Sequence, residues 1–375
     1  MNKPIKIRLH VISPIHIGCG DVYEPTSFLI DEKRKKLIEF DPVDFVKSLN
    51  SKEMEDFNRI ASSDNLLLIF KAIKRFYKPS IKGREIDVTD FLVNHYKKIL
   101  SMGTYDRKAV INQFTIEKTA FNLNSNSPYI PGSSLKGAIR TAYLGKLAND
   151  NEIKEFWKTP RLLDQRDLET TLLDLQKGKE KMSSDPFRML KISDLLPAGD
   201  VLTKIVYAVN KKKKNSDKEL LADKGEVYHI FEVIEPGAVF EGAINLEEPA
   251  DSSNIKLPIR RDFLISLNKF YVPLLEEEIK ICKRIDVKPP LINQINNRFK
   301  DRINKDAFII RLGRHSGAEA VTIEGNRYIK IMQGRGKPPK YLDHATTIWL
   351  ASDEPKPKNN SNLIPFGWAV IEVVS

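Results

Sequence analysis

The alternation of hydrophobic and polar residues predicts β-strands towards both ends of the chain. Residues 5–12 read IKIRLHVI and alternate almost perfectly, which is typical of a strand with one buried face. Two short apolar runs around the charged turn 31–36 predict a β-hairpin over residues 27–40. Four more strands are predicted near the C-terminus, at AFIIRL, RYIKIM, TTIWLA and GWAVIEVV.

The spacing of apolar residues changes to the helical period after residue 41. The segments VDFVKSL, NLLLIFKAIKRFY and DVTDFLVNHYKKIL all show apolar residues three and four positions apart. Because this block interrupts a β-rich opening, it predicts a helical insertion over about 41–112. Further helices are predicted over residues 162–176 and 262–284.

A turn that leads into a helix is predicted at PYIPGSSLKGAIRTAYLGKL, residues 128–147. Pro131 and Gly132 end the preceding segment, and Ser133 or Ser134 can cap the first helical turn by accepting a backbone N–H. One buried helix face is indicated by the helical spacing of Leu135, Ile139, Ala142, Tyr143 and Leu147.

The order of the predicted elements indicates an α+β fold. A hairpin is predicted over residues 226–246, with Pro236 and Gly237 in its turn. Strand, helix, hairpin, helix and strand are the order of a ferredoxin-like (RRM-like) domain with an antiparallel sheet. We therefore expect residues 5–12 and 229–244 to share one sheet. The expected domains are 1–250, with the helical insertion, and a second RRM-like domain at 251–375.

The charge of the chain favours a polyanionic partner. Lys and Arg total 61 against 50 for Asp and Glu, a net charge of +11, so nucleic acid is the leading partner class and an acidic membrane surface the second. The two cysteines, Cys19 and Cys282, indicate neither a disulfide framework nor a cysteine-rich zinc site. We expect no signal peptide and no membrane span, hence a cytoplasmic protein.

The first candidate site is the glycine loop SPIHIGCGD, Ser13 to Asp21, directly after the first strand. Gly18 and Gly20 permit close backbone approach, and His16 can donate to a phosphate or stack on a base. The alternative is an ordinary turn with a satisfied histidine.

The second candidate site is the start of the helix that begins near Ser133. Lys136 and Arg140 lie one turn apart, close to unpaired backbone N–H groups and the positive end of the helix dipole. This combination suits an anion, whereas the alternative is a capped surface helix with two solvated cations.

The third candidate site is IIRLGRHSGAEAVTIEG, residues 309–325. Its cations and glycines at the end of a strand suit phosphate contact, although such loops are often merely solvated. The residues concerned are Arg311, Gly313, Arg314, His315 and Gly317, and the segment QGRGKPPK adds Arg335, Lys337 and Lys340.

Four of these segments resemble the successive signatures of the CRISPR RAMP superfamily: SPIHIGCGD, YIPGSSLKGAIR, HIFEVIEPGAVFEGAI and RLGRHSGAEAVTI. With the closing TTIWLASDEP and IPFGWAVIEV, the set most resembles the subunit-five family of type III-A Csm effector complexes. The resemblance extends from the first strand to the C-terminus, and residues 41–112 are its least covered part.

The resemblance implies a non-catalytic RNA-binding subunit that caps the 3′ part of the CRISPR RNA and supports its maturation and complex assembly in antiviral defence. The implied partners are the CRISPR RNA, target RNA in the assembled complex, the Csm backbone RAMP subunit, other Csm subunits and host ribonucleases. No metal or other cofactor is implied. The predicted RNA contacts are His16, Gly18, Gly20, Ser133, Ser134, Lys136, Arg140, Arg311, Gly313, Arg314, His315 and Arg335.

Two other functions stay open at the level of the sequence. One is a RAMP endoribonuclease that cuts CRISPR RNA or target RNA, since the backbone subunit of the family cuts with an aspartate after its first strand. Asp21 and Glu24 lie in that loop here, but their spacing does not put an aspartate clearly in that place. His16 with Lys136 is a possible acid–base pair. The other function is a basic assembly protein that contacts only proteins.

Overall fold

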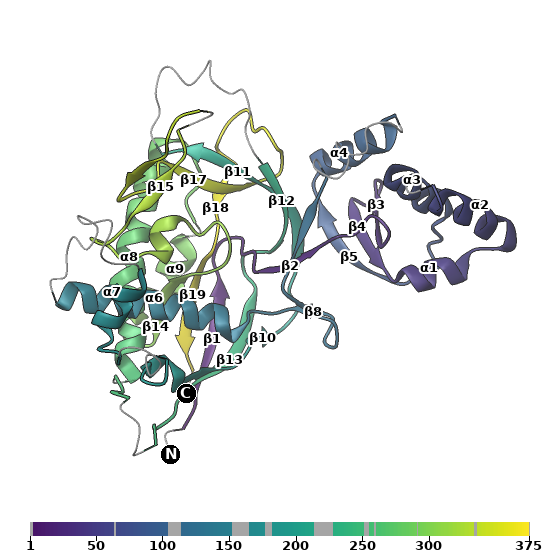
Figure 1. The fold of residues 1–375 in the computed structure, drawn as a ribbon. Coiled ribbons are helices and arrows are strands. Elements are labelled where there is room, and N and C mark those ends of the chain that lie inside the picture. Colours follow the sequence, from purple (N-terminus) through teal and green to yellow (C-terminus); the bar gives the residue numbers. More distant parts are fainter. Residues whose placement is uncertain are drawn as a thin grey trace.

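A computed structural model describes residues 3–63, 65–103, 114–151, 165–176, 182–213, 228–250, 255–258, 260–290, 292–333 and 336–374. Figure 1 shows a larger body, which holds both chain termini, and an arm that projects from it. We define the arm as residues 28–101. None of the described helices is long and apolar enough to cross a membrane.

A six-stranded sheet forms the centre of the body. Its strand order is β10-β13-β1-β19-β14, and β9 also pairs with β13. All pairs of this sheet are antiparallel. Its strands are β1 (Ile5–Val11), β9 (Leu190–Ile192), β10 (Leu196–Pro197), β13 (Val239–Leu246), β14 (Ala307–Arg311) and β19 (Trp368–Val373).

A nine-stranded sheet connects the body to the arm. Its order is β2-β6-β12-β11-β5-β4-β3, with β17 on β11 and β18 on β17. The pairs β11–β5 and β12–β6 are parallel. Its strands are β2 (Gly18–Val22), β3 (Phe28–Asp31), β4 (Lys36–Phe40), β5 (Gly83–Val88), β6 (Ile116–Thr119), β11 (Thr203–Lys212), β12 (Tyr228–Ile234), β17 (Thr347–Ser352) and β18 (Ile364–Pro365).

Two short ribbons complete the β-structure, β7 (Phe121–Asn122) with β8 (Ser127–Pro128) and β15 (Ile329–Ile331) with β16 (Lys340–Leu342). The helices of the arm are α1 (Pro42–Ser48), α2 (Ser51–Ala61), α3 (Leu66–Phe76) and α4 (Asp90–Ser101). Those of the body are α6 (Gly132–Asp150), α7 (Gln165–Leu172), α8 (Arg260–Arg284) and α9 (Ile292–Phe299), with short 3₁₀ turns at Pro186–Arg188, Lys300–Arg302 and Ala318–Val321.

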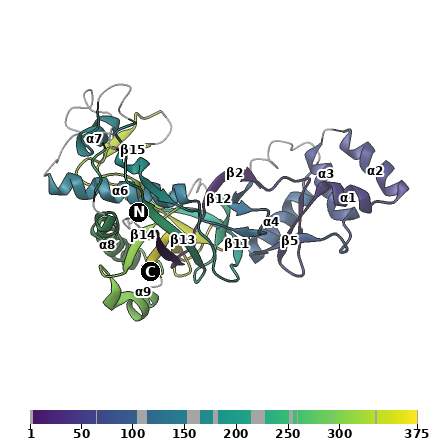
Figure 2. The same ribbon diagram turned by 90° about the horizontal axis from the view of Figure 1, so that it is seen from below.

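The main core lies between the six-stranded sheet and helices α6 and α8, which pack against each other. Figure 2 shows both helices beside β13 and β14, with the arm extending in the opposite direction. Residues with little or no exposure from β1, α6, α8, β14 and β19 form one apolar cluster, among them Leu9, Ile139, Leu267, Ile310 and Val370. This packing explains the helical spacing of apolar residues in the segment around Ser133.

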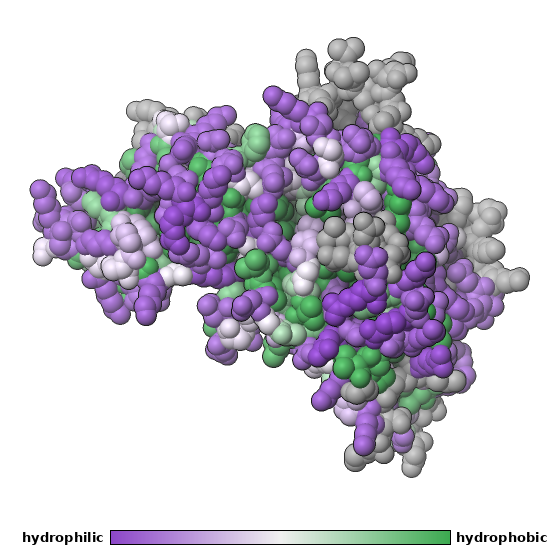
Figure 3. All heavy atoms as spheres, turned by 180° about the vertical axis from the view of Figure 1, so that it is seen from behind, coloured by the Kyte–Doolittle hydropathy of each residue, from purple (hydrophilic) through white to green (hydrophobic). Residues whose placement is uncertain are grey.

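The arm has a small core of its own. The hairpin β3–β4 and helices α1 and α3 bury Leu29, Phe40, Phe45, Ile73 and Phe76 against one another. Seen from behind, hydrophilic side chains cover much of the arm, and hydrophobic ones gather in small patches on the body (Figure 3). The block predicted to be helical also contains a strand, β5. This strand pairs with β4 and β11 and joins the arm to the nine-stranded sheet. Residues 104–112 of the predicted insertion lie outside the described residues.

Most predicted elements are confirmed. The strand over 5–12 is β1, the hairpin over 27–40 is β3 and β4, and the helix over 262–284 is α8. The four C-terminal strands are β14, β15, β17 and β19. The predicted α+β class is confirmed as well.

The predicted hairpin over residues 226–246 is wrong. Strand β12 pairs with β11 and β6, and β13 pairs with β1, β9 and β10, so the two segments belong to different sheets. Both edges of β12 are occupied, which leaves β13 no edge to pair with. The turn at Pro236 and Gly237 instead carries the chain from one sheet to the other. Of residues 229–244, only the β13 part shares a sheet with β1.

Segments from both sides of residue 250 share the central sheet. Strand β1 lies between β13 and β19, and Leu9 is opposite both Phe240 and Ile371. The same core also holds residues of α6 and α8. The two predicted domains thus pack around one core. The boundary between them at residue 250 stays a prediction.

Candidate nucleic-acid interface

The first and third predicted glycine loops meet directly. The loop Ser13–Asp21 follows β1, and the loop at residues 312–317 follows β14. The backbone N–H of Arg314 donates to the carbonyl oxygen of His16 at 2.9 Å. Gly313 has a φ of +82°, and a Cβ there would overlap the same carbonyl oxygen, so only glycine fits. We call this contact between the two loops the loop junction.

Strand β2 gives the loop junction an open backbone edge. It is the outermost strand of the path β2-β6-β12, so one row of its N–H and C=O groups points away from the sheet. Gly18 and Gly20 are both exposed, and nothing lies within 4 Å of a Cβ placed at Gly20. A phosphate or a ribose can therefore approach the backbone closely here.

His16 and His315 support the junction from inside. The Nδ1–H group of His16 donates to the carbonyl oxygen of Glu232 at 2.8 Å, and its ring stacks on Phe231 at 4.4 Å between centroids. The ring of His315 stacks on Trp349 at 4.3 Å. His16 is fully buried, so the buried, satisfied histidine that the sequence left open as an alternative describes it better than a surface donor.

Burial keeps both imidazoles of the junction neutral. It lowers the pKa of His16, and it lowers that of His315 to about 3, assisted by His229 and Arg314 nearby. The Nε2 atoms of His16 and His315 are buried and have no hydrogen-bond partner within the described part of the chain. Such atoms usually indicate an ordered water or a ligand close by.

Arg314 supplies a formal charge to the surface of the junction. Its side chain is 45% exposed, it pairs with Glu117, and its guanidinium carbon lies 5.2 Å from the ring centroid of Phe231. The aromatic ring and the carboxylate hold the guanidinium at the surface, where it can reach a phosphate.

The start of α6 is organised differently from the prediction. The N-cap is Pro131 and no side chain caps the helix, so the predicted cap by Ser133 or Ser134 is wrong. Instead the backbone N–H of Gly132 donates to the Asp194 carboxylate at 2.8 Å. A Cβ at Gly132 would overlap the carbonyl oxygen of Ile192, so the glycine allows close approach of β9.

The two cations of this helix have separate roles. Arg140 pairs with Glu169 and Asp185, each at 2.8 Å, and lies 4.9 Å from the ring centroid of Phe187. It therefore fixes α6 to neighbouring segments and does not present a free charge. Lys136 has no ion pair among the described residues. Burial is the main cause that lowers the pKa of Lys136, and the charge of Lys191 adds to it. Arg140 lowers this pKa further, whereas Asp185 raises it.

The helix start is nevertheless linked to β2 by a short ladder of backbone hydrogen bonds. The N–H of Ala120 donates to the carbonyl oxygen of Ile17, the residue before β2, at 2.8 Å. The N–H of Tyr129 donates to the carbonyl oxygen of Ala120 at 3.2 Å. Ser133, which is exposed, and Ser134 and Lys136, which are half-buried, follow four to seven residues after Tyr129. The loop junction and the helix start are thus neighbouring parts of one continuous framework.

Arg311 is a structural residue. Its side chain is buried, its Nη1 pairs with Glu278 at 2.5 Å, and its Nε donates to the carbonyl oxygen of Phe366 at 2.9 Å. Trp368 donates from its indole N–H to the other Glu278 oxygen at 2.6 Å. Arg311, which the sequence predicts as an RNA contact, is instead held inside the protein, because the strand that carries it is buried on both faces.

The remaining predicted contact, Arg335, lies outside the described residues. Its neighbours Lys337 and Lys340 are exposed.

Comparison with known proteins identifies the family. The model of the RAMP superfamily matches residues 8–307. The chain belongs to the RAMP superfamily. Among its relatives is the CRISPR system Cms protein Csm5 of Methanocaldococcus jannaschii, to which this RAMP chain is 27% identical over 99% of its length and 89% of the relative. The protein of the same name from Streptococcus thermophilus is 28% identical over 52% of each chain.

Two solved structures share the fold of this RAMP chain. One comes from a cryo-EM structure of a Csm–crRNA–target RNA ternary complex of a type III-A CRISPR-Cas system, with a TM-score of 0.60 and 19% identity over 99% of this chain and all of that one. The other is the crystal structure of T. onnurineus Csm5, with a TM-score of 0.55 and 20% identity over 97% and 99% of the two chains.

A buried carboxylate that the sequence analysis missed positions the junction of this RAMP chain. Glu232 is fully buried, accepts from the Tyr23 hydroxyl at 2.8 Å and the Thr119 N–H at 3.3 Å, and pairs with Arg84. Its own carbonyl oxygen holds His16. The available signal was a charged residue inside the apolar run HIFEVI, since a buried charge requires partners.

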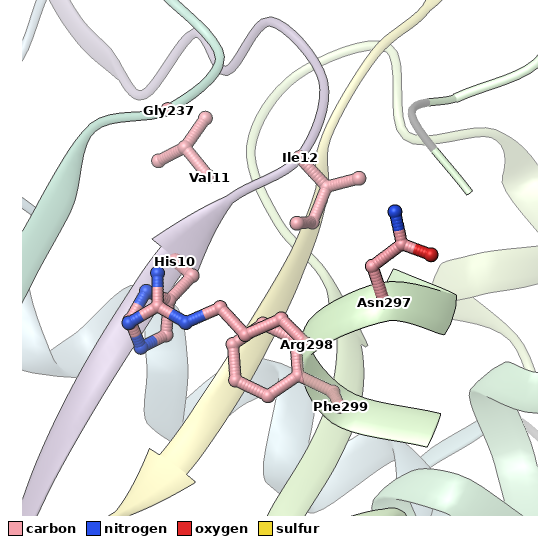
Figure 4. A pocket seen from close by; sticks show the side chains of 7 residues that line it. All are labelled: His10, Val11, Ile12, Gly237, Asn297, Arg298 and Phe299. Atoms are coloured by element: carbon pink, nitrogen blue, oxygen red, sulfur yellow. The ribbon is translucent and has the colours of Figure 1, made fainter. Parts of the chain in front are cut away.

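A cavity of about 380 Å³ opens where β1 of this RAMP chain ends (Figure 4). His10 hydrogen-bonds through Nε2 to Glu372 at 2.7 Å, and its ring tilts against Phe299 at 5.0 Å. Arg298 extends towards His10 and brings a cation to a lining that is otherwise largely apolar. No predicted RNA contact lines it; the lining residues are His10, Val11, Ile12, Gly237, Asn297, Arg298 and Phe299.

Proposed function

We propose that this chain is a non-catalytic RNA-binding subunit of a type III-A CRISPR (Csm) ribonucleoprotein, which holds the 3′ part of the CRISPR RNA and supports its maturation and complex assembly. The observation that carries the proposal is the loop junction, where a glycine-rich edge strand and Arg314 meet at one surface. The net charge of +11 and the Csm5 name of both relatives support it.

The residues that the sequence predicts as RNA contacts divide into direct contacts and residues that hold the surrounding structure in place. Gly18, Gly20, Ser133, Ser134, Lys136 and Arg314 contact the RNA backbone directly. His16, Gly313 and His315 position the loop junction, Arg311 holds strand β14, and Arg140 holds helix α6. Arg335 is proposed as a phosphate contact from the sequence alone.

The proposed partners are the CRISPR RNA, target RNA in the assembled complex, the backbone RAMP subunit, other Csm subunits and host ribonucleases, all in the cytoplasm. The solved complex with the same fold contains crRNA and target RNA, as its name states. Guide RNA would then bridge this chain and the backbone subunit.

The burial of His16 favours a binding role over the alternative endoribonuclease. A general acid or base has to reach the reacting oxygen of the substrate, and the ring of His16 is fully enclosed by protein. Its lowered pKa also keeps the ring neutral, so it cannot readily supply a proton near neutral pH.

The test is the binding of labelled single-stranded guide RNA to the full chain at several salt concentrations, with and without a divalent metal ion. We expect a mobility shift without cleavage, and an affinity that falls steeply with salt because phosphate contacts release counterions. Arg314→Ala should weaken binding and reduce the salt slope by about 0.7, the value for one single-strand phosphate contact.

The matched control is Arg59→Ala, which removes an exposed arginine from α2 of the arm and should leave the affinity unchanged. Affinity that does not depend on salt would contradict the proposal. Cleavage of the RNA by the parent protein would instead support the endoribonuclease.

A further inference from the structure

The ribbon β15–β16 carries two exposed tyrosines that stack on each other. The rings of Tyr328 and Tyr341 are 4.2 Å apart between centroids and only 8° from parallel. The two residues are 48% and 41% exposed. A solvent-exposed, parallel stack of this kind has ring surface available for another planar group.

The tyrosines belong to one exposed face of the ribbon. Tyr341 is the cross-strand partner of Lys330, and side chains at every second position of a strand point to the same face. Tyr328, Lys330 and Met332 are accordingly exposed, whereas Ile329 and Ile331 between them are half-buried. Exposed apolar surface gathered on one face indicates a binding surface.

Among the described residues, the ribbon is also a sheet of only two strands that pairs with neither of the two large sheets. Two-stranded sheets are marginally stable on their own in water, so a partner on the open face would stabilise this one. Both Figure 1 and Figure 2 place β15 away from β2.

The charge of the segment selects the partner. From position 327 to 344 the sequence holds one acidic residue, Asp343, which pairs with His344 at 2.6 Å. The cationic residues of the same segment are Arg327, Lys330, Arg335, Lys337 and Lys340. Cations interspersed with exposed aromatic rings are the features that bind single-stranded nucleic acid, because phosphates meet the charges and bases stack on the rings.

We propose that the ribbon β15–β16 is a second contact for single-stranded RNA, separate from the loop junction. Bases continue the stack of Tyr328 and Tyr341, and Lys330 and Lys337 meet the phosphates. This contact rests on the proposed function, since it takes RNA as the partner, and it adds base stacking to a protein whose other proposed contacts are to the RNA backbone.

The test is equilibrium binding of fluorescent oligouridine to the full chain. The double variant Tyr328→Ala with Tyr341→Ala should bind about tenfold more weakly, the loss expected for one stacked base. Tyr328→Phe with Tyr341→Phe keeps both rings and should retain the parent affinity. Photo-crosslinking with 5-iodouridine should label Tyr328 or Tyr341 in the parent protein. Since both tyrosines are exposed, unchanged thermal midpoints should accompany all these results.

Equal affinity of the Ala double variant and the parent would overturn the inference. An equal loss in the Phe double variant would overturn it too, because the hydroxyl groups and not the rings would then matter. Unchanged RNA binding together with lost binding of another Csm subunit would assign this face to a protein. If Arg314→Ala weakens binding and the tyrosine variant does not, only this inference fails. A parent protein that binds no RNA refutes the proposed function as well.

Discussion

The loop junction and the start of α6 show the same signals in sequence, glycine beside serine or histidine and cations, yet the structure uses them differently. At the junction, Gly313 lets two distant loops touch, and the edge of β2 with Gly18 and Gly20 stays open. At the helix start, Gly132 lets strand β9 approach closely, and the Asp194 carboxylate accepts a hydrogen bond from the backbone N–H of Gly132. An anion-binding pattern can therefore be satisfied from within the protein.

The difference matters because backbone N–H groups and arginines bind whichever anion is closest. Arg140 finds two carboxylates of its own chain, whereas Arg314 finds one and remains nearly half exposed. The unequal roles of the loop junction and the helix start can be tested by changes to Gly132, His315 and Arg140.

Gly132→Ala should lower the free energy of unfolding by about 3 kcal/mol, because the added methyl group overlaps the backbone of Ile192 and Ser193, which cannot easily move. Gly137→Ala in the same helix is the matched control. Its Cβ meets nothing within 4 Å, so this variant should gain about 0.5–1 kcal/mol from helix propensity. Chemical denaturation measures both, and similar stabilities would contradict the packing role of Gly132.

The junction should lose stability in acid. His315 has a folded pKa of about 3, below the unfolded value of 6.5, so the unfolded chain binds a proton first as the pH falls. The contribution of His315 to the free energy of unfolding is complete above about pH 6.5, and it is about 2 kcal/mol smaller at pH 5. His315→Asn cannot titrate there and tolerates the positive φ at this position, so its denaturation curves should depend less on pH. An unchanged pH dependence would show that His315 is not buried in solution.

Arg140→Ala should lower the free energy of unfolding by about 1–2 kcal/mol, since it leaves Glu169 and Asp185 without their cation. RNA affinity of the folded variant should not change. Lys136→Ala should change RNA binding and not stability. Its free energy of unfolding should stay within about 0.5 kcal/mol of the parent, and it should bind RNA more weakly. Thermal melts and RNA titrations of the two variants decide this, and weaker RNA binding by the stable fraction of Arg140→Ala would contradict the separation of roles.

The hairpin over residues 226–246 shows what a local pattern cannot reveal. Its two strands and its Pro-Gly turn are all present, but β12 and β13 pair with different neighbours. Which edge a strand occupies depends on every other strand of the sheet. A turn motif fixes the local path of the backbone and leaves the pairing undetermined.

Sequence alone determined most of the elements and the α+β class, because hydrophobic periodicity and turn residues are local properties. It marked Gly18, Gly313 and Arg314 as candidate RNA contacts but did not show that their loops touch. The tertiary structure decided which cations stay available, since Arg140 and Arg311 find carboxylates that are distant in sequence. It also decided that His16 is enclosed. Burial and pairing depend on the partners that folding brings together, and these cannot be read from neighbouring residues.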